Sequence, residues 1–219
     1  MNHTQMIART ALLVGAVASI SAAQATGQQF DLDRRVQAFL DSHRRSWRDM
    51  NVPASDGQAL YDVIVRNGYT RALEIGTSTG HSGIWIAWAL SKTGGTLITI
   101  EIDEQRYHEA LRNFEDAGLS QYIDARLADA HELVRTLPGP FDFVFLDADK
   151  DWYSQYFRDV YPKVEIGGCF TAHNVSDRGG RGGRGMGGFV AELQNTPNLE
   201  TEFVRGGGGL SVSYKRAPS

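Results

Sequence analysis

Residues 73–82 read LEIGTSTGHS, and this stretch predicts a turn from a buried strand into a helix. The apolar residues before Gly76 are typical of a strand, and a helical pattern begins near Ser82. Gly76 and Gly80 lie between the two elements, where glycine allows the backbone to approach a ligand closely. The following helix N-terminus offers free N–H groups and a positive potential. The stretch therefore predicts a ligand-binding turn.

The glycine spacing of this turn disfavours two common nucleotide-binding motifs. The nicotinamide fingerprint is G-x-G-x-x-G, whereas residues 76–80 have the spacing G-x-x-x-G. No Gly-Lys-Ser/Thr follows, so the phosphate-binding loop of nucleotide triphosphatases is also absent. Taken alone, the motif is equally compatible with a generic tight turn between a strand and a helix.

Strand-like and helical patterns alternate on both sides of this turn. The helical patterns cover residues 30–50, 56–67, 104–117 and 152–161, and the strand-like runs cover 72–75, 96–102, 123–127, 141–146 and 169–172. The run FDFVFL at 141–146 is almost wholly apolar, as a strand covered on both faces should be. Residues 202–204 and 210–214 flank a glycine run, Gly206–Gly209, and predict a closing hairpin. The chain is therefore expected to form an α/β fold with a central, mostly parallel sheet, helices on both faces and a C-terminal antiparallel hairpin.

Acidic residues end the next two predicted strands. Glu101 lies 25 residues after Gly76, where a carboxylate can accept hydrogen bonds from two ribose hydroxyls. Asp129 and Ala130 follow the next strand, where an adenine could lie. The alternative for Asp103 and Asp129 is a helix N-cap.

A carboxylate cluster follows the apolar strand, in the stretch FLDADKDWY at 145–153. Ligands of open α/β sheets bind outside the carboxyl ends of the strands. Carboxylates gathered beside a buried strand usually have a cation as partner. His173 and Asn174 end the neighbouring predicted strand, which favours a functional over a purely structural histidine there.

Together, these motifs resemble the cation-dependent O-methyltransferases of the catechol and caffeoyl-CoA type. These are S-adenosylmethionine (SAM) enzymes with a Rossmann-like, class I methyltransferase fold. The resemblance covers residues 56–216 and rests on LEIGTSTGHS, LITIEID, the ADA segment, FDFVFLDADKDWY and the GG…HNV segment. It implies methyl transfer from SAM to a hydroxyl of a small, catechol-like acceptor, assisted by a divalent cation.

The resemblance also implies roles for individual residues. Gly76, Gly80 and Ser82 would hold the methionine end of SAM, Glu101 the ribose, and Asp129 and Ala130 the adenine; Glu74 and Asp147 complete the cofactor-binding set. Lys150 would be the catalytic base, and Asp147, His173 and Asn174 would be the metal ligands.

Three features depart from the family pattern. The family has Asp-Asn where this chain has His173-Asn174. An all-oxygen site suits Mg²⁺, whereas an imidazole favours Mn, Fe, Co or Zn, so His173 implies another metal or weaker binding. A glycine- and arginine-rich segment, 178–188, follows the metal segment, and Gly206–Gly209 replaces an Asp-Gly turn.

The first 25 residues have the pattern of a secretory signal. They contain no Asp or Glu, and Arg9 is followed by the apolar run 10–20 and the small residues 21–25. The run is shorter than the roughly 20 residues that a membrane-spanning helix needs. We expect a signal peptide at 1–25 and one methyltransferase domain at 26–219. With this signal the protein would be periplasmic or secreted. Without it the protein would be cytoplasmic.

Composition narrows the alternatives. With 22 basic and 26 acidic side chains the net charge is −4, which argues against a generally basic nucleic-acid binder. The single cysteine, Cys169, excludes an intrachain disulfide scaffold and a cysteine-based zinc site. Two alternatives stay open, a metal-independent SAM-binding relative with another acceptor and an RNA-binding module using the arginines of 178–188. The sequence also leaves open whether the protein forms a homodimer.

Overall fold

The computed structural model describes residues 26–45, 47, 50–176 and 186–218. The predicted signal peptide at 1–25 and most of the glycine- and arginine-rich segment lie outside these residues. Within the described ranges, no helix combines the length and apolar character needed to cross a bilayer.

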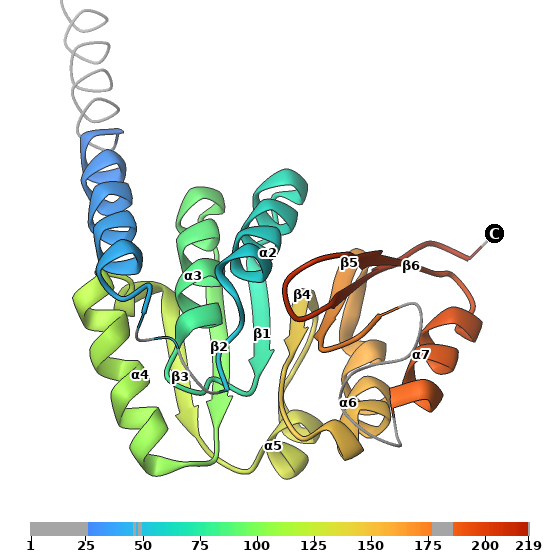
Figure 1. Ribbon diagram of the computed structural model, residues 1–219. Helices are drawn as coiled ribbons and strands as arrows, with labels where there is room; N and C mark the ends of the chain where they lie inside the picture. Colours follow the sequence, from blue (N-terminus) through green and yellow to red (C-terminus); the bar gives the residue numbers. More distant parts are fainter. Residues whose placement is uncertain (1–25, 46, 48–49, 177–185, 219) are drawn as a thin grey trace, which may run out of the picture.

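A seven-stranded sheet forms the centre of the molecule (Figure 1). Its order is β3 (Ile123–Leu127), β2 (Thr96–Glu101), β1 (Arg71–Ile75), β4 (Phe141–Leu146), β5 (Val164–His173), β7 (Leu210–Lys215) and β6 (Leu199–Val204). The first five strands are parallel, and β7 pairs antiparallel with both β5 and β6. This confirms the predicted mostly parallel sheet with a C-terminal antiparallel hairpin.

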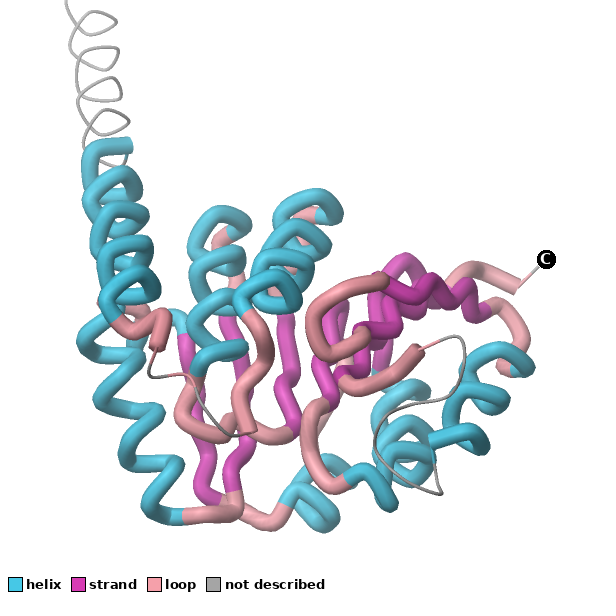
Figure 2. Tube along the Cα trace, viewed as in Figure 1, coloured by secondary structure: helices cyan, strands magenta, loops and turns pink. Residues whose placement is uncertain are grey.

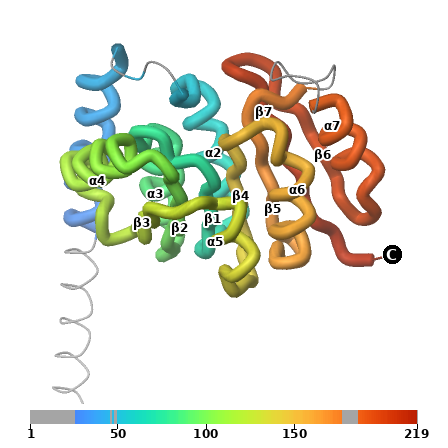
Figure 3. Tube along the Cα trace, turned by 90° about the horizontal axis from the view of Figure 1, so that it is seen from below, coloured from blue at the N-terminus to red at the C-terminus, as the bar shows by residue number. Residues whose placement is uncertain are grey.

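Helices cover both faces of the sheet (Figure 2). The helices are α2 (Ala54–Asn67), α3 (His81–Thr93), α4 (Glu104–Ala117), α5 (Ala130–Thr136), α6 (Tyr153–Val160) and α7 (Met186–Asn195), with short 3-10 turns at Ser120–Tyr122, Lys150–Trp152 and Tyr161–Lys163. Residues 26–42 are also helical. This segment and α2–α4 contribute to the clusters on one face, whereas α5–α7 build the cluster on the other. In Figure 3, α2, α3 and α4 lie in a row along the sheet.

The strand 141–146 shows why this layering forms. Phe143 and Phe145 pack towards α2 and α3, whereas Val144 and Leu146 pack towards α6 and α7. All four side chains are completely buried. Since burying such a side chain contributes about 1.5–3 kcal/mol, the strand is stable only when helices cover both faces.

The predicted bounds of the first helix were wrong. The predicted helix 30–50 ends at residue 42, and Met50 has a left-handed backbone (φ 59°) that a helix cannot contain. Trp47 instead stacks on His81, with ring centroids 4.5 Å apart. The last three residues of the glycine- and arginine-rich segment, 186–188, begin α7, where the buried Met186 and Phe189 anchor the helix.

Strand β5 is longer than predicted. The sequence indicated 169–172, but the strand begins at Val164. Residues 165–167 are exposed, and a register shift against β4 occurs in this part. This exposed segment, which ends at Gly167, lacks the apolar pattern by which strands are recognised.

Candidate functional site

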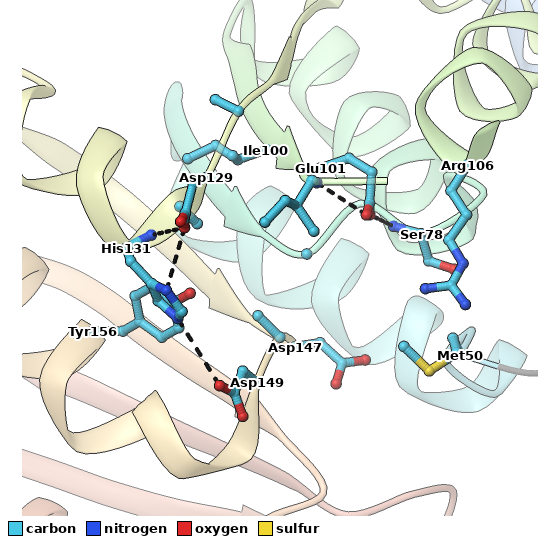
Figure 4. A pocket seen from close by; sticks show the side chains of 15 residues that line it. Met50, Ser78, Ile100, Glu101, Arg106, Asp129, His131, Asp147, Asp149 and Tyr156 are labelled. Carbon is cyan, nitrogen blue, oxygen red and sulfur yellow. Dashed lines mark hydrogen bonds and ion pairs between the residues drawn. The ribbon is translucent and has the colours of Figure 1, made fainter. Parts of the chain in front are cut away.

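A pocket of about 410 Å³ lies at the carboxyl ends of the parallel strands (Figure 4). Its walls are formed by Met50, Gly76, Ser78, Ile100, Glu101, Ile102, Arg106, Ala128, Asp129, Ala130, His131, Asp147, Ala148, Asp149 and Tyr156. Five of the residues expected to bind a cofactor are among them, namely Gly76, Glu101, Asp129, Ala130 and Asp147. The five parallel strands bring them together because their carboxyl ends lie at the same edge of the sheet.

The glycine turn brings β1 and β4 into close contact. Gly76 has a φ of 96°, and a Cβ atom added to it would lie 2.3 Å from the backbone oxygen of Asp147. The Asp147 N–H donates to the carbonyl of Ile75 at 2.9 Å. Only glycine combines this backbone conformation with this close approach. The turn therefore places the Asp147 backbone directly beside the pocket.

Glu101 fixes the opposite wall of the pocket. Its carboxylate accepts hydrogen bonds from the N–H groups of Ser78 (2.7 Å), Ile102 (3.0 Å) and Asp103 (2.9 Å). The side chain is 7% exposed and lines the pocket. A carboxylate has about four acceptor positions, so capacity remains for a ligand hydroxyl.

Asp129 and His131 form the wall facing Glu101 (Figure 4). Asp129 caps α5 by accepting from the N–H of His131 at 2.9 Å, so its predicted N-cap role is confirmed. The His131 ring stacks on Trp152 with centroids 3.8 Å apart, and Tyr156 lies next to it. Sequence reasoning missed His131 and Tyr156. His131 directly follows the ADA segment, which was the available signal.

Several predicted cofactor residues lie behind the pocket wall. Glu74 is completely buried, and neither it nor Gly80 nor Ser82 lines the pocket. The Thr99 hydroxyl donates to Oε2 of Glu74 at 2.6 Å, while Oε1 has no hydrogen-bond partner. Burial raises the pKa of Glu74 to about 7, and the hydrogen bonds from Ser82 and Thr99 offset only part of this effect.

We expect Glu74→Gln to remove a pH dependence from stability. A folded-state pKa raised from 4.5 to about 7 gives stability that is fully present below pH 4.5 and lost as the pH rises through 7. Each pKa unit corresponds to about 1.4 kcal/mol, so wild type should lose roughly 1–3 kcal/mol between pH 5 and pH 8. Urea unfolding at both pH values measures this difference. The exposed Glu165→Gln is the control, and equal pH slopes in wild type and Glu74→Gln would contradict the prediction.

Asp147 carries a lysine partner on one carboxylate oxygen. Oδ1 accepts from Lys150 Nζ at 2.5 Å, and the same amine donates to the Tyr153 hydroxyl at 2.7 Å. Burial raises the pKa of Asp147, but hydrogen bonds and charges from His173 and Lys150 outweigh burial and hold that pKa below its ordinary value. The Lys150 side chain retains 24% exposure.

His173 occupies the other oxygen of Asp147. Its Nδ1 lies 3.0 Å from Asp147 Oδ2, and its Nε2 lies 3.0 Å from Oδ2 of Asp56. Burial lowers the pKa of His173, but the hydrogen bonds and charges of the two aspartates outweigh burial and raise it to about 9. Asn174 follows with a left-handed backbone (φ 59°). Sequence reasoning missed Asp56, which lies 117 positions from His173.

This donor set does not fit a bound divalent cation. Both nitrogens of His173 lie 3.0 Å from carboxylate oxygens, so neither nitrogen faces an open position where a metal could bind. Both Asp147 oxygens already have nitrogen partners. Among the residues that the structure describes, no group of three or more His, Cys, Asp or Glu side chains is arranged to hold a metal ion.

The sequence of this chain is similar to those of curated O-methyltransferases. Caffeoyl-CoA O-methyltransferase 1 of Zea mays is 35% identical over 138 residues, covering 60% of this chain and 53% of the maize protein. Catechol O-methyltransferase of Niastella koreensis is 39% identical over 107 residues, covering 47% of this chain and 48% of that protein. The matched region thus spans about half the length of these curated relatives.

Solved structures share the fold over most of the chain. An O-methyltransferase from Bacillus cereus, in complex with SAH, is 25% identical with a TM-score of 0.71, covering 84% of this chain and 91% of that one. The O-methyltransferase TomG from Streptomyces achromogenes, in complex with SAM, is 25% identical with a TM-score of 0.70, covering 84% and 90%.

A family model described as O-methyltransferase matches residues 26–180, which is most of the chain. This match contains the glycine turn, Glu101 and the carboxylate cluster around Asp147, the features that form the pocket. The chain therefore belongs to the O-methyltransferase family.

Proposed function

We propose that this protein transfers the methyl group of SAM to a hydroxyl oxygen of a small, catechol-like acceptor. The observation that carries the proposal is the pocket at the strand ends, with Glu101 on one wall, Asp129 on the other and Asp147 beside Lys150 at its margin. The names of the maize and Niastella relatives support this acceptor class, and the SAH and SAM complexes of the solved neighbours support the cofactor.

SAM would lie across the pocket. Glu101 would accept hydrogen bonds from the ribose hydroxyls, since it is a carboxylate at the pocket wall with acceptor capacity left. Asp129 and Ala130 would border the adenine, together with His131. Gly76 would allow the methionine end to approach the backbone. Glu74, Gly80 and Ser82 would support this turn from behind rather than contact the cofactor.

The chemistry requires an acceptor oxygen in line with the activated methyl group. Lys150, in its neutral form, would accept the hydroxyl proton at Nζ. The oxygen would then form the new C–O bond while the C–S bond breaks and its electron pair returns to sulfur. Asp147 and the Tyr153 hydroxyl hold the lysine amine in place. Holding both reactants together supplies much of the acceleration.

A divalent cation is not part of this proposal, because the contacts of Asp147 and His173 do not fit one. The proposal therefore combines a catechol-like acceptor with metal-independent transfer, and it differs from the open alternative of a metal-independent SAM-binding relative with another acceptor. The RNA-binding alternative rests on the three arginines of 178–188, all of which lie outside the described residues, and no described contact supports it.

The test is direct detection of methyl transfer. Purified protein is incubated with SAM and a panel of catechols and monophenols, and mass spectrometry follows formation of SAH and of an acceptor one methyl group heavier. Methylation of a catechol is the expected result. Absence of SAM binding in calorimetry would refute the proposal, whereas SAM binding without catechol methylation would refute only the acceptor class.

The export signal stays a proposal of its own. We propose that the signal within residues 1–25 is removed in the native host, so that the mature chain begins at or near Thr26 or Gln24. N-terminal sequencing of protein isolated from that host tests this proposal. Recovery of a chain that begins at Met1 would contradict it.

A further inference from the structure

The departures of this chain from its family meet at one place in the structure. The resemblance to the cation-dependent O-methyltransferases implies a carboxylate at the position of His173 and an Asp-Gly turn at Gly206–Gly209. The N–H of Gly208 donates to Asp56 Oδ2 at 2.8 Å, and that same oxygen lies 3.0 Å from His173 Nε2. The histidine, the glycine run and the first turn of α2 therefore form one contact cluster.

The glycine run is shaped to this cluster. A Cβ atom added to Gly208 would lie 2.3 Å from His173 Nε2, and one added to Gly207 would lie 1.7 Å from Asp56 Oδ1. A side chain at either position would force the histidine and the aspartate apart. Asp56 and His173 are 2% and 5% exposed, so water does not compete for their contact.

The contacts of the cluster occupy the atoms of His173 and Asp147 that could bind an added ion. Each nitrogen of His173 lies 3.0 Å from a carboxylate oxygen, one of Asp147 and one of Asp56. The Lys150 amine donates to the other oxygen of Asp147. A divalent cation would have to displace both His173 and Lys150 from Asp147.

We infer that the Asp56–His173–Asp147 chain takes the structural place of a divalent cation, and that this enzyme transfers methyl groups without one. His173 acts as a positioning residue. It holds one oxygen of Asp147 so that the other oxygen directs the Lys150 amine towards the pocket. The inference rests on the proposed methyl transfer for its catalytic part, whereas its metal-binding part can be measured on the protein alone.

The first experiment measures metal binding directly. Mn²⁺ is titrated into the wild type and into His173→Asp, and free Mn²⁺ is followed by electron paramagnetic resonance. We expect no saturable site in the wild type below 1 mM, on the order of the weakest biological affinities. We expect His173→Asp, which restores an oxygen-only set, to gain one saturable site. A stoichiometric Mn²⁺ site in the wild type would overturn the inference.

The second experiment separates positioning from folding. Asp56→Asn keeps the shape but removes the charge that holds His173, and we expect kcat to fall about tenfold while KM and SAM affinity stay within twofold. Asp62→Asn, an exposed position on the same helix, is the control. Unchanged kcat in Asp56→Asn would overturn the positioning role.

Activity in chelator completes the test. We expect wild-type turnover to persist in excess EDTA. Loss of turnover in EDTA, with recovery on adding Mg²⁺ or Mn²⁺, would overturn the inference while supporting the proposed methyl transfer. If no acceptor is methylated under any condition, the proposed function fails, and the Mn²⁺ titration alone judges the metal-binding part. If His173→Asp does not fold, the Mn²⁺ titration of the wild type still tests the metal-binding part of the inference.

Discussion

Lys150→Met is expected to lower kcat by roughly 10²–10⁴-fold, the usual effect of removing a general base. Methionine keeps the length of the side chain but has no amine to accept the hydroxyl proton. Because Lys150 lies outside the pocket wall that would hold SAM, calorimetry should show nearly unchanged SAM affinity. Rates on a catechol acceptor, measured with saturating SAM, give kcat directly.

The lysine experiment has a matched control away from the pocket. Lys92 also pairs with a carboxylate, that of Asp33, but it lies at the end of α3, away from the pocket. Lys92→Met should therefore leave kcat unchanged. A folded Lys150→Met variant that turns over at the wild-type rate would remove Lys150 from the reaction.

Glu101→Ala is expected to weaken SAM binding at least tenfold. Hydrogen bonds to a charged partner contribute about 1.5–3 kcal/mol each, and a factor of ten corresponds to about 1.4 kcal/mol. The substitution also deprives the Ser78 N–H of its acceptor, so the glycine turn loses one of its attachments to β2. Both effects act on the same wall of the pocket. Isothermal titration with SAM measures the change.

Glu104→Ala is the matched control for this substitution, since Glu104 is exposed at the start of α4 and does not line the pocket. Circular dichroism should show that both variants are folded. Equal SAM affinity in wild type and in a folded Glu101→Ala variant would show that the carboxylate does not hold the ribose.

The sequence alone determined the layered fold and the edge of the sheet where the site lies. Hydrophobic periodicity is a local property, so the run 141–146 predicted a strand covered on both faces without knowledge of its neighbours. Polar residues that follow such strands must gather at one edge when the strands are parallel. For this reason Gly76, Glu101 and Asp147 could be predicted to share a site before any contact was known.

Local patterns could not predict features that depend on contacts between distant segments. Glu74 lies one residue from the turn, but the pleat of β1 directs it into the core, where it accepts from Thr99 on the adjacent strand. The helix from residue 26 stops at 42 because Trp47 stacks on His81, a contact across 34 positions of sequence. Neither outcome is encoded in the periodicity of the segment itself.

Only the tertiary structure decided what His173 does. The sequence showed a histidine where the family has a carboxylate, and from residue types alone a change of metal was the natural expectation. The sheet order places β7 beside β5, which brings the glycine run against His173, and the packing of α2 adds Asp56 from the other side. Contacts between segments more than a hundred residues apart depend on strand order and helix placement, which no local pattern specifies, and these contacts give both imidazole nitrogens a carboxylate partner.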